Sequence, residues 1–448
     1  MFNITFIFEE GEPVTISALA GEKLLDVARK ANVAIDAPCS GNGVCGKCRV
    51  RLVSGYLDAP INRHISTEEY NAGWRLACLA QICGDAEIAV PDIANAYRSR
   101  MKIADISSPE EAAIFDRLRD QLMEAGFSME SDLSFLPLDL TEPTLEDTMP
   151  DNERVLRAVE AATGVPAEAV MIPYTVLKHL SWVLRESEFR VKCVLSRDQD
   201  RILIRDVLPA DNTDPIMGFA LDLGTTSLAG VIVDLQTGKI LAKASCGNGQ
   251  IRYGADVINR IIESDKLGGR KRLQDAVVKD SIIPMLAQMY RSSGINPRRI
   301  YRMVLAGNTT MNHLLLGLHS DPIRMEPFVP SFFRTDYLYV RDIDLKMNRL
   351  AELIVAPNIG SYVGGDITAG ALVSMIWNSP EMSLFIDLGT NGELVFGNSE
   401  FLMSCACSAG PAFEGGDISC GMRATDGAVE ACTIDKETME PTMTVVGG

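Results

Sequence analysis

The sequence predicts an α/β protein built from several domains. The chain has 448 residues, enough for about three domains, and its composition, 47% hydrophobic and 23% charged, is ordinary for a globular protein. Near the N-terminus, apolar residues alternate with polar ones, as in a half-buried β-strand. From Met217 onward, strand-like apolar runs alternate with helical patterns and end in glycine-rich turns, which indicates an α/β domain.

The first domain is expected over residues 1–92. Its first strand has an apolar face of Phe2, Ile4, Phe6 and Phe8. A cluster of apolar residues at 24–28 predicts a short helix after Gly21, and residues 49–53 and 87–90 predict two further strands. This order of elements suits a small β-grasp fold.

Four cysteines of this domain have the spacing of an iron–sulfur ligand set. Cys39, Cys45 and Cys48 form C-x5-C-x2-C, and Cys78 follows in W-R-L-A-C-L. The plant-type [2Fe–2S] pattern is C-x4-C-x2-C with a distant fourth cysteine, so this chain has one more residue in the first gap. The intervening glycines allow the loop to wrap closely around a cluster. We therefore expect a [2Fe–2S] ferredoxin domain that carries electrons.

Other uses of these cysteines fit less well. Zinc would prefer two C-x2-C pairs, and only Cys45 and Cys48 are spaced so. Disulfides would require an oxidising compartment, and no signal peptide pattern precedes them. Cys83 could replace Cys78 as the fourth ligand, but R-L-A-C matches the ferredoxin pattern of a cysteine that enters from a separate strand.

Composition limits the partners and the compartment. The net charge is −18 and the pI is about 4.8, which argues against nucleic acid as a partner. No apolar run has the length needed to span a bilayer, so no membrane association is expected. Eleven cysteines without a secretion signal favour a reducing cytoplasm, and a [2Fe–2S] centre favours an anaerobic setting.

The middle of the chain is expected to hold a linker, 93–106, and a small α+β domain, 107–212. Helices are predicted to start near residue 107 and over 152–163 and 174–186, and a hairpin over 190–195 and 201–207. The segment 128–153 is acidic and contains proline, so we expect a solvated loop, with an acidic docking surface as the alternative.

The last domain, 213–448, contains the motif D-L-G-T twice. Asp222 begins D-L-G-T-T-S at the end of one apolar strand, and Asp387 begins D-L-G-T-N-G-E at the end of another. Each motif precedes a further strand and therefore forms a tight hairpin. In such a turn the N–H groups and threonine hydroxyls face an anion and the aspartate holds Mg²⁺. One copy is a weak signal, but two predict a nucleotide site.

Several further residues are candidates for this site. The predicted nucleotide-binding residues are Asp222, Gly224, Thr225, Thr226, Asn308, Asp387, Gly389, Thr390 and Asn391. Asn308, in L-A-G-N-T-T-M, could instead cap the helix that follows. Asp366, near a helix start in G-G-D-I-T-A-G, could be an N-cap or could position the attacking water.

The order of these motifs resembles the actin-like ATPase superfamily, which includes acetate and sugar kinases, heat-shock chaperones and actin. That resemblance implies two phosphate hairpins and a connecting helix that bears a carboxylate, here Asp366. It assigns the catalytic roles to Asp222, Asp366 and Asp387, with ATP or ADP and Mg²⁺ as cofactors.

The C-terminal cysteines Cys405, Cys407, Cys420 and Cys432 could form a second metal site. Their spacing is loose and their surroundings are apolar, so buried free thiols are the preferred interpretation. Glu414 lies in a glycine-rich stretch, 408–416, that would border the nucleotide cleft.

A ferredoxin domain fused to an actin-like ATPase domain resembles the reductive activators of corrinoid proteins. The strings A-L-D-L-G-T-T-S, L-A-G-N-T-T-M-N-H-L, A-P-N-I-G-S-Y-V-G-G-D and S-C-A-C-S-A-G-P-A-F-E-G are similar to those of that family. The resemblance implies ATP-dependent reduction of Co(II) to Co(I). It also implies a corrinoid protein and an upstream electron donor as partners. The sequence does not fix the oligomeric state, and a homodimer is one possibility. The alternatives are a small-molecule kinase with a fused ferredoxin, and an electron-transfer or docking protein whose nucleotide site does not function.

One departure from the family concerns the end of the chain. Family members carry a further glycine-rich adenosine-binding segment after the second phosphate hairpin, and this chain ends near the point where that segment would begin. We therefore expect the C-terminal part of the ATPase domain to be missing and nucleotide binding to be weakened.

Overall fold

The computed structural model describes most of the chain. Excepted are residues 9–12, 32, 34, 36, 38–40, 42, 44–45, 92–108, 199, 255, 408–426, 436–437 and 446–448. The expected linker 93–106, together with Cys39, Cys45, Glu414 and Cys420, lies outside the described residues.

The N-terminal domain is a five-stranded sheet in the order β2-β1-β5-β3-β4. Its strands are β1 (Phe2–Ile7), β2 (Val14–Ala18), β3 (Arg49–Asp58), β4 (Trp74–Leu76) and β5 (Gln81–Ala89), with helices α1 (Leu24–Lys30) and α2 (Thr67–Asn71). The first strand and the helix begin where the apolar pattern predicts them. Strands β3 and β5 are longer than predicted because their antiparallel pairing continues past two register shifts and includes polar residues.

The small α+β domain is a four-stranded sheet in the order β6-β8-β9-β7, with helices on it. Its elements are β6 (Leu133–Asp139), α5 (Asp151–Thr163), β7 (Val170–Met171), α6 (Tyr174–Glu186), β8 (Arg190–Asp198) and β9 (Arg201–Pro209). The expectation of a solvated loop over 128–153 is wrong for its middle part, where β6 pairs with β8. Pro137 is tolerated there because β6 is an edge strand, and buried Leu133 and Leu138 hold the strand against the core.

The core of the last domain is a mixed sheet in the order β12-β11-β10-β13-β14. Its strands are β10 (Met217–Leu223), β11 (Ser227–Asp234), β12 (Ile240–Gly247), β13 (Ile300–Gly307) and β14 (Glu352–Val355). The helices are α7 (Val257–Asp265), α8 (Gly269–Val277), α9 (Ile283–Ser293), α10 (Thr309–Leu315) and α11 (Asp321–Arg324). Strands β10, β13 and β14 are parallel, so their carboxyl ends meet at one edge of the sheet.

A second, three-stranded sheet lies beside that edge, in the order β15-β16-β17. It consists of β15 (Ser383–Leu388), β16 (Gly392–Gly397) and β17 (Leu402–Cys407), and α12 (Gly365–Val373) packs between it and β13. Strands β18 (Val429–Ile434) and β19 (Pro441–Val445) form a separate hairpin. Helix α4 (Pro109–Glu124) and several one-turn helices complete the elements: Ala167–Ala169, Gly249–Tyr253, Pro297–Arg299, Val340–Ile343 and Ile376–Asn378, with a π-helical turn over Val278–Ile282.

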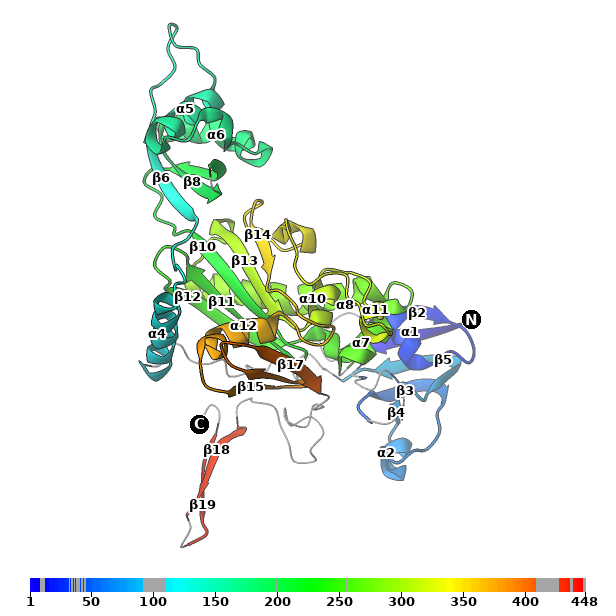
Figure 1. Cartoon of the computed structure of the whole chain (residues 1–448). Helices are drawn as coiled ribbons and strands as arrows, with labels where there is room; N and C mark the ends of the chain where they lie inside the picture. The colour runs from blue at the N-terminus through cyan, green and yellow to red at the C-terminus, as the bar shows by residue number, and fades with distance from the viewer. Residues whose placement is uncertain are drawn as a thin grey trace.

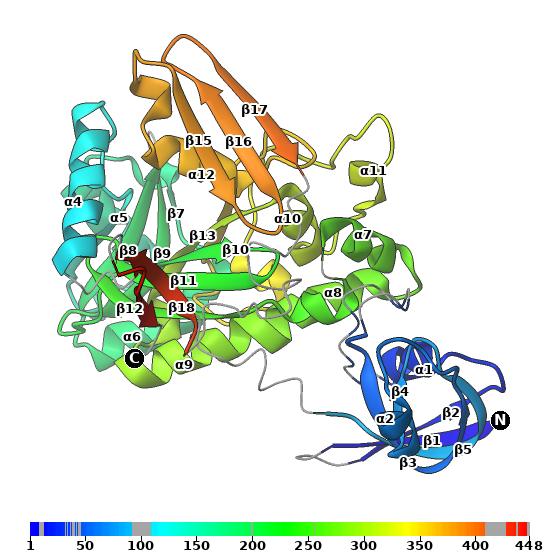
Figure 2. The same ribbon diagram turned by 90° about the horizontal axis from the view of Figure 1, so that it is seen from below.

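The small domain and the N-terminal domain lie at different sides of the core sheet. Figure 1 shows the small domain with α5 and α6 beyond one end of β10 and β13, and the N-terminal sheet beside α7 and α8. Figure 2 shows α8 and α9 along one face of the core sheet. At the side of the N-terminal domain, a guanidinium nitrogen of Arg29 on α1 lies 3.8 Å from a carboxylate oxygen of Glu263 on α7, which is fully buried. No helix in the part of the chain that the structure describes is both long and apolar enough to cross a membrane.

Candidate functional site

Two of the four predicted cluster ligands lie side by side in the N-terminal domain. Cys48 immediately precedes β3 and Cys78 follows β4, and their sulfur atoms are 3.2 Å apart. Both residues are only 1% exposed. The hydrogen bond from Cys48, together with a backbone hydrogen bond from Gly43, lowers the pKa of Cys78 to about 7 against the penalty of burial. A thiolate is therefore accessible near neutral pH, and the thiolate is the form that binds iron.

The position two residues before Cys48 requires glycine, because it lies very close to a neighbouring side chain. Gly46 has a φ of +69°, and a Cβ atom there would lie 2.7 Å from the ring of His64. The loop therefore runs closer to the domain than any other residue would permit. Cys83, the alternative ligand, lies on β5 with its side chain exposed, whereas Cys78 contacts Cys48.

The first D-L-G-T motif forms the turn between β10 and β11. A Cβ atom at Gly224 would lie 2.5 Å from the carbonyl oxygen of Ser227, so only glycine fits this turn. Thr225 and Thr226 follow, 8% and 7% exposed. Asp222, one residue before the end of β10, pairs with Ala306 on β13 and so stands at the edge where the parallel strands end.

The second motif forms the turn between β15 and β16 and lies against the first. The hydroxyl oxygens of Thr226 and Thr390 are 2.8 Å apart. Gly389 and Asn391 lie in the same turn, where the Gly389 N–H donates to the Asn391 carbonyl at 3.0 Å. The fold thus brings together two hairpins that the sequence predicts separately.

Three predicted aspartates surround the meeting point of the hairpins. Burial, with added repulsion from Asp366 and Asp387, raises the pKa of Asp222 to about 6, although water still reaches its side chain. Burial also raises the pKa of Asp366 to about 6, and it raises the pKa of Asp387. Bringing three acids close together in this way costs free energy that a bound cation would recover.

Asp366 is held in place by close packing of α12. The N-cap of α12 is Gly364, so Asp366 is not the cap but a first-turn residue whose carboxylate accepts from the Ile367 N–H at 2.9 Å. A Cβ atom at Gly365 would lie 2.5 Å from the Ala356 carbonyl oxygen. The helix start can approach the end of β14 only because this residue is glycine.

Glu393 is a fourth acid of the site, and it was not among the predicted site residues. It is 4% exposed and pairs with Asp387 across the β15–β16 hairpin. Burial first, then repulsion by Asp366 and Asp387, raises the pKa of Glu393 to about 8. The sequence feature that could have identified Glu393 is an acidic residue in the otherwise apolar strand G-E-L-V-F-G.

Asn308 caps a helix and also lies beside Glu393, while its contact with a phosphate stays a prediction. Its side-chain oxygen accepts from the Thr310 N–H at 3.0 Å and so caps α10. Its amide nitrogen faces the carboxylate of Glu393 at 3.5 Å, which places Asn308 at the site as well.

The donor set fits Mg²⁺ shared with phosphates rather than a metal cage. In the described ranges, no group of three or more His, Cys, Asp or Glu side chains could hold a metal ion by itself. Mg²⁺ usually keeps several waters and uses one or two carboxylates together with substrate phosphates. Asp222, Asp366 and Asp387 suit that chemistry.

The expectation of buried thiols at the C-terminal cysteines is wrong for those that the structure describes. Cys405 and Cys407 on β17 and Cys432 on β18 are exposed. Apolar character suggested burial, but β17 is the edge strand of its sheet and no described segment covers it.

Comparison with known protein families covers most of the chain. Residues 7–83 match the 2Fe-2S iron-sulfur cluster binding domain. Residues 122–214 match the RACo linker region, 217–379 the RACo middle region, and 381–448 the C-terminal domain of RACo, the ASKHA domain.

Individual relatives extend over the same regions. The corrinoid activation enzyme RamQ of Eubacterium limosum is 30% identical over 90% of this chain and 61% of its own length. A reductase of the methylated amine-specific corrinoid protein, from Methanosarcina barkeri, is 28% identical over 49% of this chain and 41% of its own. The chain thus spans less than two thirds of these curated relatives.

A solved structure matches the whole chain. It is the reductive activator for corrinoid iron–sulfur protein, with 30% sequence identity and a TM-score of 0.63, covering 100% of this chain and 69% of that one. The chain therefore belongs to the family of reductive activators of corrinoid proteins.

Proposed function

We propose that this protein reduces the cobalt of a corrinoid protein from Co(II) to Co(I), with electrons from a [2Fe–2S] cluster and free energy from ATP. The observation that carries the proposal is that one chain holds two different sites. The Cys48–Cys78 pair would bind an iron–sulfur cluster that carries electrons. The Thr226–Thr390 contact joins two hairpins of the kind that bind phosphate. The names of the relatives support the same activity.

The cluster would be held by four thiolates of the N-terminal domain. The proposed ligands are Cys39, Cys45, Cys48 and Cys78. The cluster supplies one electron at a time. This chain's own contribution is the low thiol pKa of Cys78 and the loop closed by Gly46, which together favour ligand thiolates held in a compact arrangement.

The nucleotide would lie between the two hairpins. Backbone N–H groups and hydroxyls of the two turns would donate to its phosphates, and these donors come from Gly224, Thr225, Thr226, Thr390 and Asn391. Gly389 would shape the second turn, since its N–H already donates to the Asn391 carbonyl. Asp222 and Asp387 would hold the waters of Mg²⁺, and Asp366 would orient the attacking water. Glu393, with its raised pKa, would hold a proton beside them.

Coupling between the two sites is needed because the reduction is uphill. Plant-type [2Fe–2S] centres have potentials near about −400 mV, and Co(I) is a stronger reductant than such a centre. A nucleotide can make up the difference only if its bound states favour the corrinoid partner's Co(I) state over the Co(II) state.

The decisive experiment mixes chemically reduced protein with a Co(II) corrinoid protein, with and without Mg–ATP, and follows visible absorbance. Co(I) that appears only with Mg–ATP supports the proposal. Co(I) formed equally without ATP would show a simple electron carrier, and phosphorylation of an added small molecule would show a kinase. Asp387→Asn should remove the ATP effect, and the exposed residue Asp336, changed to Asn, is the matched control.

A further inference from the structure

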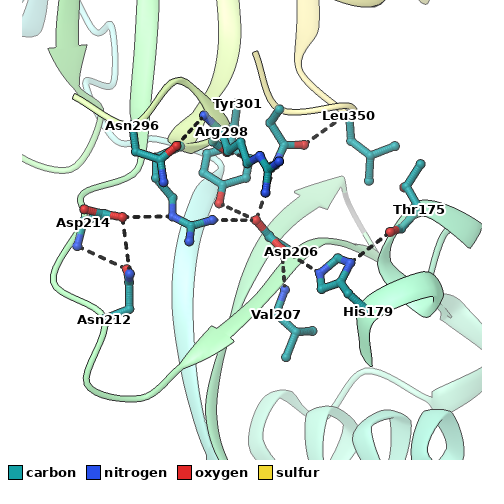
Figure 3. Close-up of polar contacts among 12 residues, drawn as sticks. Thr175, His179, Asp206, Val207, Asn212, Asp214, Asn296, Arg298, Tyr301 and Leu350 are labelled. Atoms are coloured by element: carbon teal, nitrogen blue, oxygen red, sulfur yellow. Dashed lines mark hydrogen bonds and ion pairs between the residues drawn. The ribbon is translucent and has the colours of Figure 1, made fainter. Parts of the chain in front are cut away.

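A cavity lies where the small domain meets the ATPase core, away from both proposed sites. Its volume is about 520 Å³, within the range of small-molecule sites. The small domain contributes α6 and the end of β9. The core contributes the one-turn helix Pro297–Arg299 and the loop 347–349. Figure 3 shows the polar side chains at this junction.

The floor of the cavity is a closed network around Asp206. One carboxylate oxygen accepts from the Val207 N–H at 3.0 Å and faces Nε2 of His179 at 3.1 Å. The other accepts from Arg299 at 3.0 Å and from the hydroxyl of Tyr301 at 3.0 Å. The negative charge of Asp206 is therefore already compensated, and the network fixes the two domains against each other (Figure 3).

His179 lies between two acceptors in this floor. Its Nδ1 lies 3.1 Å from the carbonyl oxygen of Thr175, and its Nε2 faces the carboxylate of Asp206. Both ring nitrogens thus face acceptors, an arrangement that only the imidazolium form satisfies completely. The hydrogen bond to Asp206 raises the pKa of His179 accordingly.

The rim carries cations without carboxylate partners. Lys178, Arg298 and Arg349 line the cavity with exposed side chains, and none of them forms an ion pair with any residue that the structure describes. Arg205, deeper in the wall, is by contrast paired with Glu352. Arg299 is likewise paired, with Asp206 and Asp214, so the excess of positive charge at this cavity comes from Lys178, Arg298 and Arg349. Such a local excess of positive charge attracts anions.

Trp182 supplies a flat apolar wall. It lies on α6 one turn beyond Lys178, lines the same cavity and is 66% exposed. A single exposed tryptophan is ordinary on a protein surface, and at this position it gives the cavity an aromatic face beside its cations. Its ring can contact the apolar part of a ligand whose charged end meets the rim.

We propose that this cavity binds a small organic anion that carries at least two phosphate or carboxylate charges. The charges would meet Lys178, Arg298 and Arg349, and the apolar part of the anion would lie against Trp182. Because these residues come from two domains, the bound anion would also strengthen the junction between them. This site is separate from the proposed nucleotide site and does not depend on it.

The test is calorimetric titration of the full chain with two probes, pyrophosphate and citrate, at constant ionic strength and without divalent cations. We expect each of Lys178→Gln, Arg298→Gln and Arg349→Gln to weaken binding about 3- to 10-fold, and the triple variant to abolish it. The matched controls Lys239→Gln and Arg291→Gln remove exposed cations elsewhere and should change nothing. Tighter binding of pyrophosphate or of citrate identifies the charged group.

Two further measurements test where the anion binds and whether it stabilises the protein. Thr226→Val alters the nucleotide site, so unchanged pyrophosphate binding by that variant places the anion elsewhere. Thermal unfolding with probe should shift upward in the parent chain and not in the triple variant. Equal affinity in parent and triple variant overturns the proposal. So does the absence of binding up to about 10 mM probe, or binding only of a polyglutamate peptide, which would indicate a protein partner instead.

Discussion

Thr226 and Thr390 share a hydrogen bond of 2.8 Å between their hydroxyl oxygens, although 164 residues separate them in the chain. One belongs to the core sheet and the other to the three-stranded sheet, and both are buried. The two hairpins are therefore in direct contact at the point where phosphates would bind. One hydroxyl donates in this hydrogen bond, so a phosphate would accept from the other hydroxyl of the pair.

Replacing Thr390 with valine tests this contact. The change keeps the shape of the side chain but leaves the buried hydroxyl of Thr226 without this partner, which should cost about 1 kcal/mol of unfolding free energy. We expect ATP hydrolysis to fall about 10-fold because a phosphate donor is lost. Urea unfolding and phosphate release measure the two effects. Thr442→Val, an exposed change on β19, is the control, and a loss equal to that of the control would contradict the assignment.

Glu393 should give the protein a pH-dependent stability. Its pKa is raised to about 8 in the folded protein from 4.5, so its stabilising contribution is complete below about pH 4.5 and is lost as the pH rises through 8. Glu393→Gln mimics the protonated form. Above pH 8 it should therefore be more stable than the parent by roughly 1–3 kcal/mol, and near pH 4 the two should agree.

Urea unfolding across this pH range measures the difference, with exposed Glu400→Gln as the control. The same Glu393→Gln variant should lose ATP hydrolysis if the group moves a proton there. Parallel stability curves for the variant and the parent would contradict the raised pKa.

The cluster assignment distinguishes Cys78 from Cys83. Cys78→Ser removes a sulfur 3.2 Å from that of Cys48, so the reconstituted protein should lose its visible absorbance and its bound iron. Cys83→Ser, on the exposed side of β5, should keep both. Absorbance and iron content are the measurements. Equal loss in both variants would mean that the assignment of the fourth ligand is wrong.

Gly365 should be essential for the position of Asp366. In Gly365→Ala the new Cβ would meet the Ala356 carbonyl oxygen at 2.5 Å, so the start of α12 must move. We expect ATP hydrolysis to fall by more than about 10-fold, with a smaller change in stability, since a misplacement of about 1 Å disrupts catalysis more than packing. Gly84→Ala has open space and serves as the control. Full hydrolysis by Gly365→Ala would contradict this placement.

Local patterns in the sequence predicted the fold class and the family, and both are confirmed. The strand β1, the helix α6 and the two D-L-G-T turns are set by apolar periodicity and glycine, which are local properties. The edge strand β6 was missed because its acidic surroundings and Pro137 hide a short apolar alternation that only pairing with β8 makes visible.

The site was less predictable than the fold because its contacts are long-range. Nothing in the sequence around Thr226 or Thr390 indicates that their hydroxyls form a hydrogen bond with each other. Glu393 follows a turn and could equally face solvent, and only the folded arrangement beside Asn308 and β15 makes it a buried acid. The exposure of Cys405 and Cys407 likewise depends on which segments cover β17, which apolar composition cannot show.

Helix α7 touches both halves of the molecule. Near its start, buried Arg260 donates to the carbonyl oxygen of Thr225 in the first phosphate hairpin. One turn later, Glu263 faces Arg29 of the ferredoxin domain at 3.8 Å. Less than one turn of helix therefore separates the first D-L-G-T hairpin from a contact with the ferredoxin domain. Under the proposed function, a nucleotide that displaces this hairpin would also change the position of the domain from which the electron leaves.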